Sequence, residues 1–140
     1  MPYINHIISV VSLLVKCGED DADLLQAAIL HDSVEDSKTT LETVAERYGL
    51  KVASIVEELS DDMTLDYTIR KEHQLNNSLV ISKEAKLIRL ADKTCNIRDF
   101  INFPIKKTIE DQEKYCDWSQ RIFERIKGNN IKLDNEFSKV

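Results

Sequence analysis

Apolar residues recur along this chain at intervals of three and four, the spacing of a helix with one buried face, and no segment alternates apolar and polar residues as a half-buried strand does. Only three glycines and two prolines interrupt the pattern. Stretches of helical period lie at 4–15, 24–31, 39–48, 52–59, 67–79, 82–95 and 108–126. The sequence therefore predicts an all-α bundle of about six or seven helices.

Three details of this helical pattern can be compared with a structure. The first stripe predicts a buried face made of Ile4, Ile7, Ile8, Val11, Leu14 and Val15, ended by Gly18. Thr39 and Glu42 have the spacing of a capping box that starts the third helix. Residues 129–140 lack a periodic stripe, so we expect one domain at 1–128 followed by a frayed polar tail.

The charge balance limits the kinds of partner. With 19 Lys and Arg against 25 Asp and Glu, the formal net charge is -6, which argues against a general nucleic-acid or anionic-membrane surface. The apolar run 7–15 is too short to span a bilayer, and the three cysteines are odd in number and far apart, as in reduced cytosolic proteins. We therefore expect a cytoplasmic protein with neither a nucleic-acid nor a membrane partner, in which an anionic ligand meets local cations or a metal.

The densest ionisable run next to an apolar helix is His31-Asp32-Ser33-Val34-Glu35-Asp36. If the helix continues through this run, His31 and Glu35 lie one turn apart, as do Asp32 and Asp36. Three carboxylates this close repel one another unless protons or a cation compensate. A divalent metal ion would relieve the repulsion, and the alternative is a solvated acidic helix end.

Two further residues could join such a site. Asp92 lies against apolar helix positions in the segment 87–93, where an ionised carboxylate needs a partner. That partner could be a metal ion or an ion pair with Arg89 or Lys93. His6 lies among isoleucines, where a histidine is either a ligand or a hydrogen-bonded core residue.

Taken together, these residues supply nitrogen and oxygen donors suited to Mn, Fe, Co or Zn. The candidate ligands are His6, His31, Asp32 and Asp92. An ion held in this way lowers the pKa of bound water and polarises a phosphoryl oxygen, while Glu35 and Asp36 are placed to handle the proton. The basic residues Arg70, Lys71, Lys93 and Arg98 could bind phosphate or could simply be solvated.

Five segments of the chain follow one another in a set order. They are Pro2-Tyr3-Ile4-Asn5-His6, the run 31–36, Glu58-Leu59-Ser60-Asp61-Asp62, Arg70-Lys71 and the run 90–99. Their order and spacing resemble those of the RelA/SpoT-type HD hydrolases, and most of all the small stand-alone alarmone hydrolases of the metazoan SpoT-homologue type. The resemblance covers residues 2 to about 126. It implies an HD-domain helical bundle that holds one Mn²⁺ ion through His6, His31, Asp32 and Asp92.

The resemblance also implies an activity. Relatives of this type hydrolyse the 3′-pyrophosphate of guanosine tetra- or pentaphosphate (ppGpp or pppGpp), giving GDP or GTP and pyrophosphate. Glu35 and Asp36 would position or activate the water. The implied substrate contacts are Tyr3 and Asn96 at the nucleoside, with Arg70, Lys71, Lys93 or Arg98 near the phosphates.

The sequence departs from the family pattern at its beginning. Members usually have a further N-terminal helix and a basic segment before the Pro-Tyr-Ile stretch, whereas this sequence begins at Met1-Pro2, so we expect weaker selection of guanine. Two alternatives stay open: an HD phosphohydrolase of another nucleotide such as NADPH, or a catalytically inert HD domain that binds metal or nucleotide. Retention of every ligand type together with Glu35 and Asp36 favours an active hydrolase.

Overall fold

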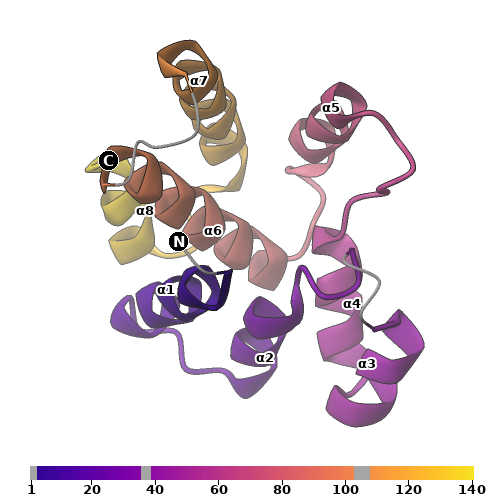
Figure 1. Cartoon of the computed structure of the whole chain (residues 1–140). Coiled ribbons are helices and arrows are strands. Elements are labelled where there is room, and N and C mark those ends of the chain that lie inside the picture. Colours follow the sequence, from indigo (N-terminus) through magenta and orange to yellow (C-terminus); the bar gives the residue numbers. More distant parts are fainter. Residues whose placement is uncertain (1–2, 36–38, 103–107) are drawn as a thin grey trace.

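Eight helices form the regular structure of residues 3–35, 39–102 and 108–140, the parts of the chain that this computed structural model describes, and no strand occurs in them (Figure 1). Their bounds are α1 Tyr3–Lys16, α2 Ala22–Leu30, α3 Leu41–Tyr48, α4 Leu50–Leu59, α5 Tyr67–Asn77, α6 Lys83–Asn102, α7 Ile109–Ile126 and α8 Ile131–Ser138. The all-α prediction is confirmed, with one helix more than expected. None of these helices is both long and apolar enough to cross a membrane.

Helix α6 is the centre of the fold. It contacts α1, α2, α4, α7 and α8, and Figure 1 shows it crossing the middle of the molecule. Because neighbours cover it on several sides, its buried positions do not form a single stripe, and they include Ala85, Ile88 and Ala91, each with no exposed area. Each large apolar side chain buried in this way stabilises the fold by roughly 1.5–3 kcal/mol.

Helix α1 exists as predicted, but only part of the expected face is buried: Leu14 is buried, and Ile7 and Val11 are partly buried. Its buried residues are Val10, Leu13 and Leu14. Three residues of the expected face are more than half exposed: Ile4 58%, Ile8 55% and Val15 52%. Asn5, Ser9, Ser12 and Lys16 form a polar stripe, but apolar residues cover more than half of the helix surface, so spacing alone could not show which part of that surface meets α2 and α6. Gly18 has a φ of 91°, a left-handed conformation that glycine adopts readily, and the stop predicted there is confirmed.

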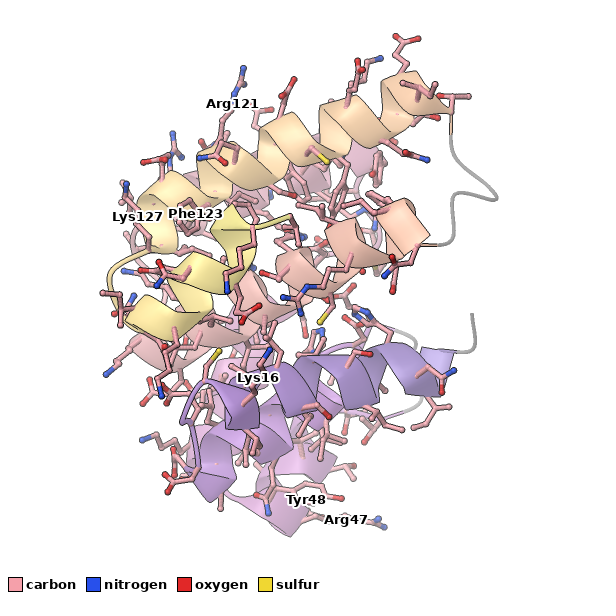
Figure 2. The ribbon with its side chains drawn as sticks, turned by 90° about the vertical axis from the view of Figure 1, so that its left-hand side faces the viewer. Lys16, Arg47, Tyr48, Arg121, Phe123 and Lys127 are labelled. Atoms are coloured by element: carbon pink, nitrogen blue, oxygen red, sulfur yellow. The ribbon has the colours of Figure 1, made fainter. Side chains whose placement is uncertain are left out.

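The C-terminal residues do not form the frayed tail that the sequence suggested. Asn130 caps α8, since its Oδ1 accepts a hydrogen bond from the Leu133 main-chain N–H at 3.0 Å. Leu133 and Phe137 are buried, and the Phe137 ring stacks on Phe123 of α7 with centroids 4.5 Å apart. Figure 2 shows α8 in yellow beside the part of α7 that carries Phe123. Residues 131–138 therefore belong to the packed domain.

Helix caps agree with the sequence at two places and differ at a third. Ser82 and Thr108, the first residues of the predicted stretches 82–95 and 108–126, accept main-chain N–H hydrogen bonds at the starts of α6 and α7. The cap of α3 is Thr40, whose Oγ1 accepts from the Thr43 N–H at 3.2 Å, and not Thr39. The capping-box prediction is therefore wrong by one residue.

Helix α5 has a different character from the rest, because none of its residues is buried. Its main contacts are with α7, and they include two hydrogen bonds to its main-chain carbonyls. Trp118 Nε1 donates to the carbonyl of Lys71 at 3.1 Å, and Arg125 donates to that of Leu75. Polar contacts therefore hold this helix in place together with Leu75, which is partly buried and packs against the core.

Candidate functional site

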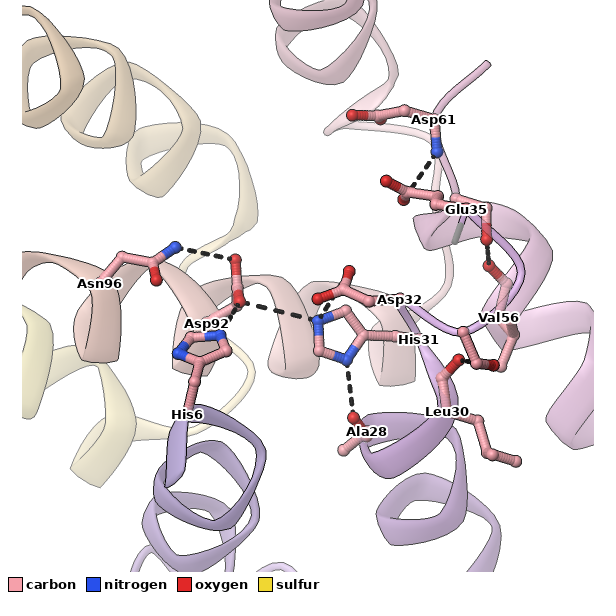
Figure 3. A network of polar contacts seen from close by, with 12 residues as sticks. His6, Ala28, Leu30, His31, Asp32, Glu35, Val56, Asp61, Asp92 and Asn96 are labelled. Atoms are coloured by element: carbon pink, nitrogen blue, oxygen red, sulfur yellow. Dashed lines mark hydrogen bonds and ion pairs between the residues drawn. The ribbon is translucent and has the colours of Figure 1, made fainter. Parts of the chain in front are cut away.

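Four of the predicted donors meet where α1, α6 and the residues just after α2 come together (Figure 3). His6 and Asp92 are 86 positions apart in sequence, yet His6 Nε2 lies 2.7 Å from Asp92 Oδ1. His31 Nε2 lies 3.6 Å from the same Asp92 oxygen and 3.4 Å from Asp32 Oδ1. Packing of α1 and α2 on α6 thus gathers two imidazoles and two carboxylates into one cluster.

A hydrogen bond to a main-chain carbonyl fixes the orientation of the His31 ring. Its Nδ1 lies 2.6 Å from the carbonyl oxygen of Ala28 and donates a hydrogen bond to it, which directs Nε2 toward the two carboxylates. This bond is possible because α2 ends at Leu30, and residues 31–35 form turns. The helix therefore does not continue through the acidic run, and that part of the sequence interpretation is wrong. A main-chain acceptor behind an imidazole is the usual arrangement at a metal ligand.

The charges of this cluster depend on one another. Burial would raise the pKa of Asp92, but its contacts with His31 and His6 hold that pKa well below the usual range. Burial would likewise lower the pKa of His31, but Asp92 and Asp32 raise it to about 9. The hydrogen bond to Asp92 raises the pKa of His6. The carboxylates thus create a strong local demand for positive charge, which protonated imidazoles or a cation can meet.

The donor chemistry fits a divalent transition metal. Neutral imidazole and carboxylate are ligands for Mn, Fe, Co and Zn. Within the described ranges, no group of three or more His, Cys, Asp or Glu side chains already surrounds a cation position, because these donors are bonded to one another. Ligands about 2.1 Å from one ion lie roughly 3 to 3.4 Å apart, close to the donor separations of 2.7 to 3.6 Å in this cluster. These three separations are therefore in the range expected of donors that share one ion.

Glu35 lies next to this cluster, at the end of the turn segment. Its Oε2 accepts a hydrogen bond from the main-chain N–H of Asp61 at 3.0 Å. Burial raises the pKa of Glu35 to about 7, and the nearby charges of Asp61 and Asp32 act in the same direction. A carboxyl group with a pKa near neutrality can both take up and release a proton in a reaction. Its predicted partner Asp36 lies outside the described residues.

Two neighbouring clefts adjoin the cluster, and we call the two together the groove. The first is a cleft of about 80 Å³ next to the donors, lined by His31, Asp32, Glu35, Leu59, Asp61, Gln74, Ile88, Arg89, Asp92 and Lys93. The second is a cleft of about 170 Å³ lined by Asp61, Tyr67, Arg70, Lys71, Gln74, Lys93, Asn96, Tyr115 and Trp118. Because Asp61, Gln74 and Lys93 line both, the groove runs from an acidic end to an end rich in cations and aromatic rings.

Two lysines mark this second end. The Nζ atom of Lys93 lies 4.2 Å from the centre of the Trp118 ring and 3.8 Å from Asp92 Oδ2. The Nζ atom of Lys71 lies 4.7 Å from the same indole ring and 4.8 Å from the ring of Tyr67. Burial lowers the pKa of Lys93, and the charge of Asp92 opposes that shift. The aromatic faces hold both ammonium groups in the groove, where they can meet an anionic ligand.

The predicted substrate contacts fall into three groups. Arg70, Lys71, Lys93 and Asn96 all line the groove. Arg98 does not join them, since it forms an ion pair with Glu136 of α8, so we leave it out of the candidate substrate site. The side chain of Tyr3 lies outside the described part of the structure.

Other groove residues were missed from the sequence. Tyr115 and Trp118 lie in the predicted helical stretch 108–126 and Gln74 in the stretch 67–79, and none of the three was given a role in a site. Asn96 Nδ2 donates to Tyr115 Oη at 2.8 Å, which connects α6 and α7 at the groove wall. The sequence positions of Gln74, Tyr115 and Trp118 did not indicate a shared site, because Gln74 lies on α5 and the two aromatic residues lie on α7.

Comparison with known proteins assigns the class. The family model described as HD domain matches residues 1–129, and the chain belongs to this family. Family membership implies a divalent metal ion, which agrees with the donor chemistry above. The Drosophila melanogaster protein named guanosine-3′,5′-bis(diphosphate) 3′-pyrophosphohydrolase MESH1 is 37% identical, over 99% of this chain and 79% of its own length. The human protein of the same name is 39% identical, over 95% of this chain and 75% of its own length.

Solved structures give the same picture. One, described as a metazoan ortholog of SpoT that hydrolyzes ppGpp and plays a role in starvation responses, matches with a TM-score of 0.93 at 36% identity. That match covers 99% of this chain and 79% of the other. A protein from Listeria monocytogenes matches with a TM-score of 0.78 at 23% identity, over 96% of this chain and 94% of the other, and shows the common fold alone.

Proposed function

We propose that this chain is a metal-dependent hydrolase that removes the 3′-pyrophosphate of guanosine tetra- or pentaphosphate, yielding GDP or GTP and pyrophosphate. The observation that carries the proposal is the gathering of His6, His31, Asp32 and Asp92 beside Glu35, at one end of a groove whose other end holds lysines. The names of the MESH1 relatives support the choice of substrate.

In this proposal, the metal ligands are His6, His31, Asp32 and Asp92, and the ion is Mn²⁺. A mixed set of imidazole and carboxylate donors suits Mn²⁺ as well as related ions. When bound, the ion supplies a lowered pKa for a water molecule and polarisation of a phosphoryl oxygen. The hydrogen bond from His31 to Ala28 keeps the ligand nitrogen directed at the carboxylates.

The protein's own groups then handle the proton. Glu35 takes a proton from the attacking water, whose oxygen forms a bond to the phosphorus attached to the ribose 3′-oxygen. The bond between that phosphorus and the 3′-oxygen breaks, and the 3′-oxygen takes up the proton that Glu35 removed from the water as the nucleotide product leaves. The pKa of about 7 suits Glu35 to this exchange at neutral pH. We propose that Asp36 shares the task of holding or activating the water.

The opposite end of the groove would hold the substrate. Lys71, Lys93 and Arg70 can neutralise phosphate oxygens, because ammonium and guanidinium groups pair with phosphate. The rings of Trp118 and Tyr67 hold these cations in place, and Asn96 offers an amide to the nucleoside. We also propose a cytoplasmic location, which the three free cysteines support.

The test is a product assay. Mn²⁺-loaded protein is incubated with ppGpp and the release of pyrophosphate is followed, with Glu35→Ala and Asp36→Ala as controls. We expect turnover by the wild type and little by either variant; wild-type turnover no higher than that of the variants would contradict the proposal. NADPH in a parallel reaction tests the other phosphohydrolase reading. An inert binder would instead show a raised melting temperature with metal and nucleotide, and no product.

A further inference from the structure

Gln74 connects the two ends of the groove. It lies on α5 and lines both clefts. Its Nε2 donates to both carboxylate oxygens of Asp61, at 3.0 and 2.8 Å, and its Oε1 accepts from Lys93 Nζ at 3.3 Å. One side chain therefore contacts a carboxylate on one side and an ammonium group on the other.

The amide is well matched to these two neighbours. A primary amide has one donor end and one acceptor end, so it can donate to a carboxylate while it accepts from an ammonium group. The neighbours also fix its orientation, because the opposite flip would place NH₂ against Lys93 and the oxygen against Asp61. Glutamate has the same length but would repel Asp61, and methionine would bond to neither neighbour.

The chain of contacts continues to the reacting end. The main-chain N–H of Asp61 donates to Glu35 Oε2 at 3.0 Å, as Figure 3 shows. The contacts therefore run from Lys93 through Gln74 and Asp61 to Glu35. Because α5 has no buried residue, packing alone does not fix the distance between these groups. Polar contacts of this kind must do so.

We propose that Gln74 is a positioning residue of the hydrolase. It holds Asp61, and through Asp61 also Glu35, at a fixed position relative to Lys93. This inference rests on the proposed function, in which Glu35 acts on the water and Lys93 on a phosphate. In this proposal Gln74 neither exchanges a proton nor contacts the attacking water. It acts through the two groups to which it is hydrogen-bonded, Asp61 and Lys93. Its loss should therefore reduce the rate of the chemical step more than the affinity for substrate, since misplacement by a fraction of an ångström lowers a rate strongly.

The experiment is a double-mutant cycle on the Mn²⁺-loaded full chain with ppGpp. The proteins are wild type, Gln74→Met, Asp61→Ala and the double variant, with Gln120→Met as a matched control because Gln120 is an exposed amide bonded to Glu124. We expect Gln74→Met to lower kcat about tenfold, with KM within about threefold of the wild type. Because Gln74 acts through Asp61, the double variant should have nearly the kcat of Asp61→Ala alone.

Two results would overturn the inference: a wild-type kcat in Gln74→Met, or effects of the two substitutions that multiply in full. A merely structural role would lower the melting temperature and leave kcat unchanged at a temperature where both proteins are folded. Urea unfolding of the same four metal-free proteins measures the Gln74–Asp61 coupling without turnover. If the wild type released no pyrophosphate while that coupling was present, the proposed function would fail and the contact itself would stand.

Discussion

The two ends of the groove are built in different ways. The donor end is formed by helices whose inward faces are closely packed, and Val10, Leu24 and Ile88 there are at most 1% exposed. The other end is shared by α5, α6 and α7, and of these α5 has no buried residue and is held by polar contacts such as that from Trp118 to the carbonyl of Lys71. Rigid packing thus fixes the groups that must share one ion and also Lys93 of α6, while Arg70 and Lys71, which would meet the phosphates, lie on an element of lower local stability.

The largest expected difference between the two ends appears on removing Asp92. In Asp92→Ala, His6 and His31 lose the carboxylate that both contact. Because even residues that only support a ligand cost 10–100-fold when mutated, we expect metal affinity and turnover to fall by at least about 100-fold. Bound metal, measured by elemental analysis, and pyrophosphate release check this. Asp117→Ala, at an exposed position of α7, is the control, and stoichiometric metal in Asp92→Ala would show that the cluster is not the metal site.

A smaller difference concerns folding stability. Ile88 of α6 has no exposed area, whereas Ile69 of α5 is 40% exposed. Ile88→Ala should lower the free energy of unfolding by about 3 kcal/mol, since it leaves a cavity in the core, and Ile69→Ala by less than about 1 kcal/mol. Urea unfolding of the two variants measures both values. Equal losses would mean that α5 is as firmly packed as the core.

A third difference separates binding from chemistry. Lys71 lines the second cleft and not the cleft beside the donors, so Lys71→Gln should raise KM for ppGpp about five- to tenfold and leave kcat within about twofold. Lys114→Gln, at an exposed lysine paired with Glu110, provides the comparison. Steady-state kinetics give both constants. A fall in kcat with unchanged KM would place Lys71 in the chemical step.

Most helices of the fold could be predicted from the sequence, but not every buried face. Helix existence was well predicted, because each helix needs apolar residues at its own spacing. The buried face of α1 was not, since Ile8 and Leu13 are equally apolar and only the neighbouring helices distinguish them. Helix α8 was missed because only Leu133 and Phe137 are buried in it, and its stability comes from packing on distant elements.

In the candidate site, too, only residues that stand out in the local sequence could be predicted. His31 and Asp32 could be singled out because acidic and imidazole groups stood together beside a buried helix. Gln74 and Trp118 could not, because a glutamine or tryptophan on a helix is ordinary until other helices bring partners to it. The contact of Gln74 with Asp61 and Lys93 joins three separate elements, and no local spacing encodes it.

The smallest expected effect concerns Glu35 in the metal-free protein. Its pKa rises from 4.5 to about 7 through burial, so the folded state keeps a proton that the unfolded state has already lost. For a group of this kind, stability falls as pH rises from about 4.5 to 7 and stays lower above that range. Glu35→Gln removes the charge yet can still accept the Asp61 N–H. It should therefore be more stable than the wild type at pH 8, by about 1 kcal/mol after allowance for solvent screening.

At pH 4, where Glu35 is neutral in both states, the two proteins should differ little. Urea unfolding at the two pH values measures the difference directly, and other titrating groups cancel because both proteins share them. A Glu35→Gln protein less stable than the wild type at pH 8 would mean that the carboxylate is stabilised in the fold. It would then be a structural partner of Asp61, poorly suited to exchange a proton at neutral pH, although it lies next to the packed donor end of the groove.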